Sequence, residues 1–201
     1  MKKMNDRGMS LVELVVAFAI LAIVTLAISG FLSTSARTYV RVNSEINLQY
    51  ESQILLSQLQ EYLVDANAGV FFDGTTLYVT DYAAGGKYDV YVFRYDSAAD
   101  ELYFGKNTVS PGFSAASLVS GDLMARHVSD FGAALTTSEL SINEGGVTTK
   151  RTQVEAIRIN LKMSIQDRSY ETSELTAPRN HPQTATISAT TTITDFIALL
   201  K

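Results

Sequence analysis

The chain of 201 residues contains no cysteine and only two histidines. The absence of cysteine excludes disulfide frameworks, thiolate metal sites and cysteine nucleophiles. Neither His127 nor His181 has a ligand-spaced histidine or cysteine partner, which argues against a zinc site. No serine lies in a nucleophile-elbow pattern. The sequence therefore predicts a protein that is not an enzyme and needs no cofactor.

Positive charge is also scarce, with 16 Lys and Arg residues against 21 Asp and Glu residues and a formal net charge of −5. Binding to nucleic acid depends on clustered basic residues that neutralise phosphates, and the chain has no such cluster. The basic residues Lys2, Lys3 and Arg7 instead precede a stretch of 23 uncharged residues, from Leu14 to Ala36. We therefore expect no nucleic-acid contact and turn to the uncharged stretch.

The uncharged stretch has the length and composition of a membrane-spanning helix. As an α-helix it is about 34 Å long, which exceeds a hydrocarbon core of about 30 Å. The twelve Leu, Ile, Val and Phe residues between Leu14 and Leu32 favour insertion by roughly 4 to 7 kcal/mol. The preceding basic residues place the N-terminus in the cytoplasm. A cleaved signal peptide is the alternative, because Thr34 and Ala36 imitate a cleavage site, but its apolar region is shorter.

The residues before the apolar helix resemble a processing signal. Gly8 and Met9 follow the basic residues, and Glu13 lies at the start of the apolar run, where a carboxylate is costly in a bilayer. This order resembles the class III leader of type IV pilins and of the pseudopilins of type II secretion and competence systems. The resemblance implies that a prepilin peptidase cuts after Gly8 and N-methylates Met9, and that Glu13 is required for assembly. Phenylalanine is the commonest residue at the position of Met9.

The resemblance also implies partners and a location. The partners are the prepilin peptidase, other pilin or pseudopilin subunits, the cytoplasmic membrane and an assembly platform. The subunit would wait in the membrane and then enter an extracytoplasmic pilus or pseudopilus. The alternative function is a single-pass membrane-anchored extracytoplasmic binding module unrelated to pili. Gly30 lies where family members often carry a helix-bending proline, so it either loosens the helix when subunits pack or provides small-residue packing between helices.

The helix is predicted to continue beyond the membrane as an amphipathic segment over residues 37–66. No proline interrupts residues 9–66, and Asn67 and Gly69 supply a C-terminal stop. A coiled-coil stalk is the alternative, although the spacing does not hold a strict repeat of 3.5 residues. The residues assigned to one apolar side of this segment are Val42, Ile46, Tyr50, Ile54, Leu55, Leu59, Tyr62 and Leu63.

The remainder of the chain is predicted to be rich in strands. Tyr, Val and Phe are frequent, and residues 157–166 alternate between apolar and polar side chains. Strands are expected over residues 76–81, 87–95, 101–106, 157–166, 170–175 and 184–194, with a loop over 107–121 and a turn over 144–146. We expect an α+β fold in which the long N-terminal helix packs on an antiparallel sheet. The domains are a cleaved leader (1–8), a transmembrane and filament-core helix (9–36), its amphipathic continuation (37–66) and an extracytoplasmic β-rich head (67–201).

The head contains two further candidate features, a segment near its end and an acidic hairpin connection. The strand over residues 154–165, followed by residues 170–180 that close with Arg179 and Asn180, is similar to the minor pilin group of the PilW proteins and the J-type pseudopilins. This similarity implies a low-abundance subunit near the fibre tip, and a major pilin is the alternative. Asp96, Asp100 and Glu101 offer oxygen ligands for calcium in a hairpin connection, or form a solvated acidic turn.

Overall fold

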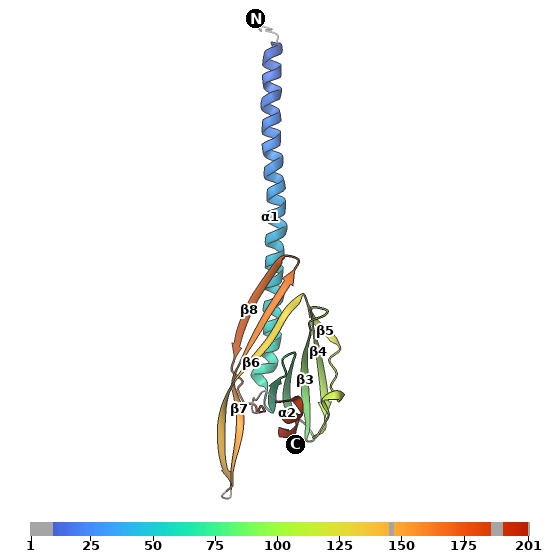
Figure 1. Cartoon of the computed structure of the whole chain (residues 1–201), viewed down its shortest axis with the longest axis vertical. Helices are drawn as coiled ribbons and strands as arrows, with labels where there is room; N and C mark the ends of the chain where they lie inside the picture. Colours follow the sequence, from blue (N-terminus) through green and yellow to red (C-terminus); the bar gives the residue numbers. More distant parts are fainter. Residues whose placement is uncertain (1–9, 145–146, 186–190, 201) are drawn as a thin grey trace, which may run out of the picture. The chain divides into compact units, whose positions relative to one another are not determined.

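The structure is a computed structural model that describes residues 10–144, 147–185 and 191–200 (Figure 1). The chain forms two compact units, residues 1–44 and residues 45–201. One helix, α1 (Leu11–Asp65), contributes to both units, and the second unit adds antiparallel strands and the short helix α2 (Ile193–Leu199). This combination confirms the predicted α+β class. The basic leader residues, Gly8 and Met9 lie outside the described residues.

In the first unit, residues 11–44 of α1 expose their apolar side chains. The helix is long and apolar enough to cross a membrane. The hydroxyls of Thr25 and Thr34 donate to the carbonyl oxygens of Leu21 and Gly30, at 2.7 and 3.0 Å, so these polar groups are satisfied within the helix. Helical structure continues through Gly30, and nothing lies within 4 Å of the position of an added Cβ there.

In the second unit, residues 45–65 of α1 pack against the head. Only some residues of the predicted apolar side are buried there. Ile46, Tyr50 and Ile54 are 55%, 65% and 41% exposed. A spacing of four residues advances about 40° beyond one helical turn, so a run at that spacing rotates away from a fixed contact face. The buried side combines spacings of three and four and consists of Leu48, Ser52, Leu55, Leu56, Leu59 and Leu63.

The first sheet of the head is an antiparallel meander of five strands in the order β1-β2-β3-β4-β5. The predicted strands over residues 76–81, 87–95 and 101–106 are confirmed, and each extends one to three residues further. The predicted loop begins after Val109 and contains a 3₁₀ turn, η1 (Ala115–Ser117). The strands are β1 (Gly69–Phe72), β2 (Thr76–Ala83), β3 (Lys87–Asp96), β4 (Glu101–Val109) and β5 (Asp122–Arg126).

The second sheet contains three antiparallel strands in the order β6-β7-β8, where the sequence predicted a single sheet. The strands are β6 (Val128–Glu144), β7 (Val147–Ile165) and β8 (Arg168–Thr176). The predicted strands over residues 157–166 and 170–175 are the end of β7 and most of β8. Of the predicted turn, Glu144 pairs with Val147 across the hairpin, and residues 145–146 lie outside the described residues.

The prediction of a strand over residues 184–194 is wrong for its described part. Gln183 alone makes isolated bridges, to Gly69 of β1 and to Gln153 of β7, and so links the two sheets. Residues 186–190 lie outside the described residues, and α2 begins at Ile193. The carboxylate of Asp195 accepts hydrogen bonds from the Thr192 N–H (2.7 Å) and hydroxyl (2.9 Å), which caps this helix and overrides the alternating Thr and Ile pattern.

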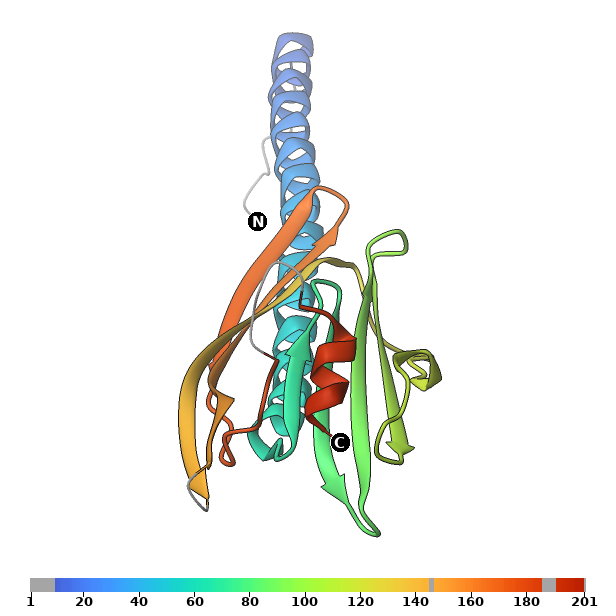
Figure 2. The same cartoon turned by 60° about the horizontal axis from the view of Figure 1, so that its bottom comes forward.

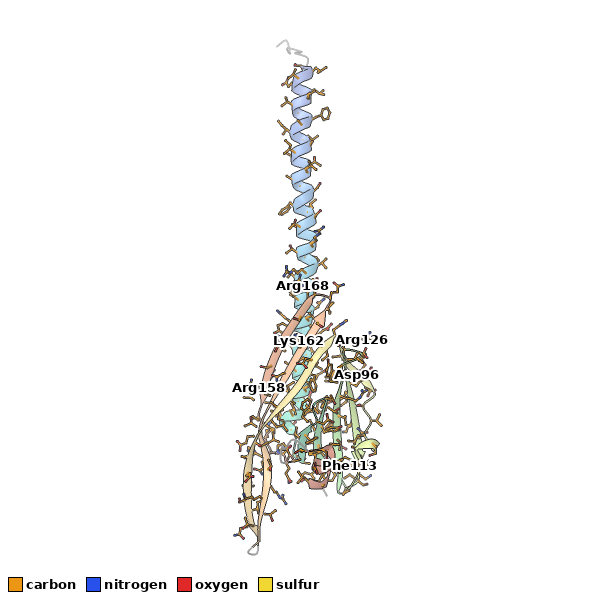
Figure 3. The ribbon with its side chains drawn as sticks, in the orientation of Figure 1. Asp96, Phe113, Arg126, Arg158, Lys162 and Arg168 are labelled. Carbon is orange, nitrogen blue, oxygen red and sulfur yellow. The ribbon has the colours of Figure 1, made fainter. Side chains whose placement is uncertain are left out.

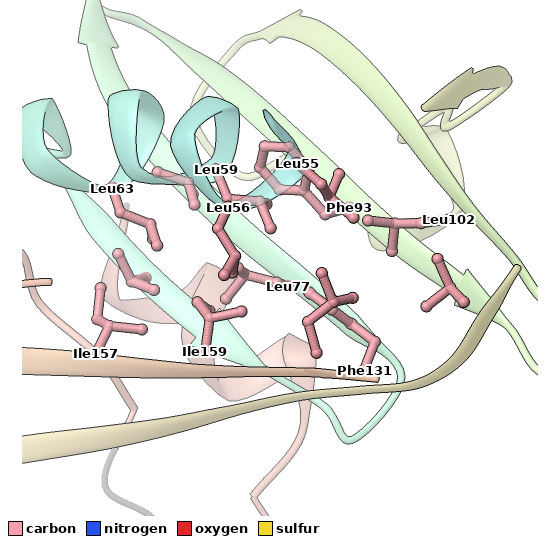
Figure 4. Packing of buried hydrophobic residues seen from close by; sticks show 14 of the residues in the cluster. Leu55, Leu56, Leu59, Leu63, Leu77, Phe93, Leu102, Phe131, Ile157 and Ile159 are labelled. Carbon is pink, nitrogen blue, oxygen red and sulfur yellow. The ribbon is translucent and has the colours of Figure 1, made fainter. Parts of the chain in front are cut away.

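The two faces of the five-stranded sheet are covered by different helices. On one face, Leu55, Leu59 and other residues of α1 pack with Leu77, Phe93 and residues of the second sheet (Figure 4). On the other face, Phe196 of α2 stacks on Phe71 with ring centroids 5.5 Å apart (Figure 2). The end of α1 and both sheets therefore belong to one continuous head.

Candidate assembly site

The described N-terminus of α1 is a capped helix end that carries Glu13. The Ser10 hydroxyl accepts a hydrogen bond from the Val12 N–H at 3.3 Å, and the Ser10 carbonyl accepts from the N–H groups of Glu13 and Leu14 at 3.0 and 3.2 Å. Glu13 therefore lies in the first turn, where the helix dipole favours a carboxylate. Glu13 is exposed, so its carboxylate is accessible to another chain.

The apolar side chains after Glu13 have no partners within their own unit. They are distributed on all sides of the helix, because consecutive residues such as Val15 and Val16 are both exposed. A helix that is apolar all round is typical of a membrane span or of the interior of an assembly. The exposed large apolar residues between Leu11 and Leu32 are Leu11, Val12, Leu14, Val15, Val16, Phe18, Ile20, Leu21, Ile23, Val24, Leu26, Ile28, Phe31 and Leu32.

Arg179 and Asn180, which follow β8, contact the C-terminal end of α1. The Arg179 N–H donates to the Val64 carbonyl at 3.0 Å, and its guanidinium lies 3.3 Å from a carboxylate oxygen of Asp65. The Asn180 amide donates to the Asp65 carbonyl, also at 3.3 Å. The pair thus satisfies carbonyl groups that a helix end leaves without partners, and ties the chain after β8 to the end of α1.

The proposed calcium ligands are not brought together as a metal site. Glu101 pairs with Arg126 at 3.4 Å and accepts a hydrogen bond from the Tyr103 hydroxyl at 2.5 Å. Asp96 lies 3.7 Å from Arg94 (Figure 3 shows Asp96 and Arg126). Asp100 has a φ of 55°, which is a turn conformation. Among the described residues, no three His, Cys, Asp or Glu side chains form a group that could hold a metal ion.

The two histidines occupy backbone turns. His127 has a φ of 63° and His181 a φ of 44°, in the left-handed region where histidine is one of the better tolerated residues. The His127 carbonyl accepts a hydrogen bond from the Ser164 N–H at 2.8 Å, which joins the start of β6 to β7. This hydrogen bond gives His127 a backbone role.

Two carboxylates face each other across β2 and β3, and their pKa values are shifted in opposite directions. Asp81 and Asp89 are direct cross-strand partners. Burial raises the pKa of Asp81, to which the nearby Asp89 charge contributes a smaller part. Hydrogen bonds from the Thr108 hydroxyl (2.6 Å) and the Lys106 ammonium (3.0 Å) lower the pKa of Asp89. The ammonium of Lys106 pairs with Asp89 and also acts to lower the pKa of Asp81, so one cation offsets part of the repulsion between the two carboxylates.

Sequence reasoning missed a groove between α1 and β5. Two adjoining cavities of about 400 and 330 Å³ share Gln58 of α1 and Met124 of β5. Because β5 itself was not predicted, nothing in the sequence placed residues 122–127 beside the helix. The groove lies within the second unit, and its principal lining residues are Ile54, Gln58, Tyr62, Phe104, Leu123 and Met124.

Comparison with protein families gives one match, the prokaryotic N-terminal methylation motif, over residues 3–29. The matched segment includes Gly8, Met9 and Glu13 and extends along the apolar helix to one residue before Gly30. The head lies outside the match. The comparisons with curated proteins and with solved structures found no significant match.

Proposed function

We propose that this chain, whose N-terminal segment is the class III prepilin leader of type IV pilins and pseudopilins, is a minor pilin or pseudopilin near the tip of its fibre. The observation that carries the proposal is the methylation motif over residues 3–29, which includes the first part of a helix that exposes its apolar side chains. A prepilin peptidase removes such a leader, and the mature subunits assemble with other pilin subunits. The role is structural and uses no cofactor.

The proposed domain organisation follows from the cleavage. Residues 1–8 are the leader, residues 9–36 anchor the precursor and later form the filament core, residues 37–66 continue the helix, and residues 67–201 form the extracytoplasmic head. The basic leader favours a cytoplasmic N-terminus, which places the head outside before assembly. Assembly then moves the apolar helix from lipid to a core of packed helices. Gly30, which meets no steric restraint in the isolated chain, allows either a looser helix or close helix packing there.

Glu13 is proposed to set the axial register of the subunit. Cleavage after Gly8 creates a positive amine on Met9, and N-methylation preserves that charge. An isolated charge inside a core of packed helices costs several kcal/mol, so each charge needs a partner. We assign Glu13 to the Met9 amine of the neighbouring subunit. The exposed position of Glu13 in the first helical turn supports this assignment.

A place near the tip is supported by the similarity of the segment ending in Arg179 and Asn180 to minor pilins. The contacts of this pair with Val64 and Asp65 give the similar segment a structural role, because they hold the head to the end of α1. The fibre would serve adhesion, motility, secretion or DNA uptake. Counting the copies of this chain per fibre, relative to the other subunits, separates a tip subunit from a major pilin.

The test of the function is the ratio of this chain in sheared fibres to that in membranes for Glu13→Gln. The amide cannot offset the buried ammonium, so the variant should insert in the membrane and lose its leader, yet enter fibres poorly. Glu174→Gln, a change of the same type on β8, is the matched control and should enter fibres normally. Equal incorporation of both variants would remove Glu13 from the assembly mechanism. A chain that never enters fibres and retains residues 1–8 would support the anchored binding module.

A further inference from the structure

We propose that the groove between α1 and β5 receives the β6–β7 arm of a second copy of this chain. The arm is the part of the β6–β7 hairpin formed by residues 138–144 and 147–151. The proposal rests on the proposed function in one respect, namely that at least two copies of the chain lie next to each other near the tip of a fibre. It names the two surfaces that meet and the side chain that anchors them.

The groove combines aromatic walls with an excess of negative charge. Tyr62 and Phe104 are half-buried, with ring centroids 5.4 Å apart, and both line the larger cavity. Glu61 and Asp122 line the same cavity, and Glu51 lines the adjoining one. Arg126 also lines the adjoining cavity, but its guanidinium pairs with Glu101 at 3.4 Å. Within the described part of the chain, none of these three carboxylates forms an ion pair. The groove therefore suits a cation with an apolar or planar body.

The strand that borders the groove has a free edge. β5 pairs with β4 and ends the five-stranded sheet. Its residues Asp122 and Leu123 are exposed, the latter 41%. Exposed edge strands present unpaired backbone N–H and C=O groups, to which another extended segment can add by hydrogen bonding. The groove thus offers a backbone template beside its cation-binding walls.

The arm supplies an extended segment without a third strand. β8 pairs with β7 only from Ile157 to Ile165, and the segment around Gln183 makes backbone hydrogen bonds to β7 only at Thr152 and Val154. Among the described residues, those of β7 before Thr152 pair with β6 alone. A two-stranded ribbon is marginally stable by itself in water, so the arm gains stability when a further strand joins it.

Arg151 is the cation that fits the groove. It is exposed on the free part of the arm and forms no ion pair with a described residue, whereas the adjacent Lys150 lies 3.2 Å from Glu139. A guanidinium stacks on aromatic rings and donates hydrogen bonds to carboxylates at its edge, which matches Tyr62 and Phe104 beside Glu61 and Asp122. Arg158, on the paired part of β7 (Figure 3), cannot bring a free strand edge, because β6 and β8 flank it.

The positions of the two surfaces favour a head-to-tail contact between two neighbouring copies. The arm and β5 lie on opposite sides of the second unit (Figures 1 and 2). An interface between two different surfaces of the same chain is heterologous, and it propagates when the rotation does not close a ring. The interface therefore fits a fibre and does not produce a closed dimer.

The experiment uses the full chain in cells that assemble the fibre. Because the chain has no cysteine, introduced cysteines are its only thiols. One tagged copy carries Gln58→Cys in the groove, and a second, differently tagged copy carries Thr149→Cys on the arm. Sheared fibres are treated with a short bis-maleimide, and the doubly tagged product is measured. The matched control replaces Thr149→Cys by Ser173→Cys, an exposed position on β8 away from the arm.

We expect the doubly tagged product with Thr149→Cys and not with Ser173→Cys. Adding Arg151→Glu to the arm copy should lower the yield at least about tenfold, as expected for a desolvated charge pair. Adding Glu61→Lys and Asp122→Arg to the groove copy should then restore it. Equal yields for the arm and the β8 position, or a yield unchanged by Arg151→Glu, would overturn the proposal, as would a groove cysteine that links only to a different subunit.

The same samples separate this proposal from the proposed function. If the chain enters fibres without residues 1–8 but gives no arm-to-groove product, only the contact between copies is wrong. If the chain retains residues 1–8 and stays in the membrane, the assignment as a prepilin fails instead.

Discussion

The two parts of α1 differ in what covers their apolar side chains. In residues 11–44, Phe31 remains 71% exposed, whereas in residues 45–65 Leu59 is completely buried. The second part finds its partners in the head of the same chain, on two sheets that surround one side of the helix. The first part finds none in its own unit, so lipid or other subunits must cover it. The helix is thus a fixed structural element of the head at one end and a surface for other molecules at the other.

The largest effect is expected from a substitution in the buried part of α1. Leu59→Ala removes a fully buried side chain and should lower the free energy of unfolding of the head by about 2 to 5 kcal/mol. Ile46→Ala, on the exposed side of the same segment, and Ile23→Ala, in the first unit, should each change it by less than about 0.5 kcal/mol. Denaturant unfolding of the detergent-solubilised chain measures all three. A loss for Ile23→Ala equal to that for Leu59→Ala would contradict the division between the two parts.

A smaller effect tests how tightly the head is packed away from the helix. A Cβ on Gly105 of β4 would collide with the Val119 carbonyl oxygen, because the loop after η1 lies directly against the strand backbone. Gly105→Ala should therefore destabilise the head by about 1 to 3 kcal/mol through overpacking. Gly132→Ala on β6, where nothing lies within 4 Å of the added carbon, is the matched control. Equal unfolding midpoints for the two variants would show that the loop after η1 moves aside without destabilising the head.

The smallest effect concerns the carboxylates of Asp81 and Asp89 and depends on pH. The lowered pKa of Asp89 means that its carboxylate stabilises the fold above the ordinary value of 3.8 and that this contribution is lost as the pH falls through the lowered pKa. The raised pKa of Asp81 has the opposite sign, since its charged form is the costly one. Asp89→Asn should lower the unfolding midpoint at pH 7 and by less near pH 3, whereas Asp81→Asn should not lower it at pH 7. The same loss for both variants at pH 7 would refute this assignment.

The sequence predicted the elements with strong periodic or compositional signals. The uncharged run from Leu14 to Ala36 and the absence of proline indicated one long helix, and Tyr-rich and Val-rich segments located β2, β3 and β4. β6 was missed because Gly132, two alanines and several Ser and Thr residues give it little apolar alternation. The strand predicted over residues 184–194 failed because a local cap at Thr192 and Asp195 starts a helix. Long-range contacts decide segments such as β6, and a single sequence does not contain them explicitly. The cap of α2 is a local signal, which the alternating Thr and Ile pattern concealed.

The candidate sites divide in the same way. Gly8, Met9 and Glu13 could be predicted because they lie close together in the sequence, within the motif matched over residues 3–29. The groove could not be located, because Gln58 and Met124 meet only when β5 is placed beside α1. The apolar spacing of Ile46, Tyr50 and Ile54 was recognised but assigned to the buried side, and the structure shows that these residues are available to another molecule.

The central claim is that the exposed apolar helix becomes the N-terminal end of a mature fibre subunit, and the mature N-terminus tests it most directly. Intact-mass analysis of the membrane-extracted chain should show the loss of residues 1–8 and one added methyl group on Met9. Gly8→Leu, analysed beside it, should retain the leader, because glycine is the residue that lets a protease approach the backbone closely. A wild-type chain that retains Met1, or one that is cut after Ala36, would contradict the account.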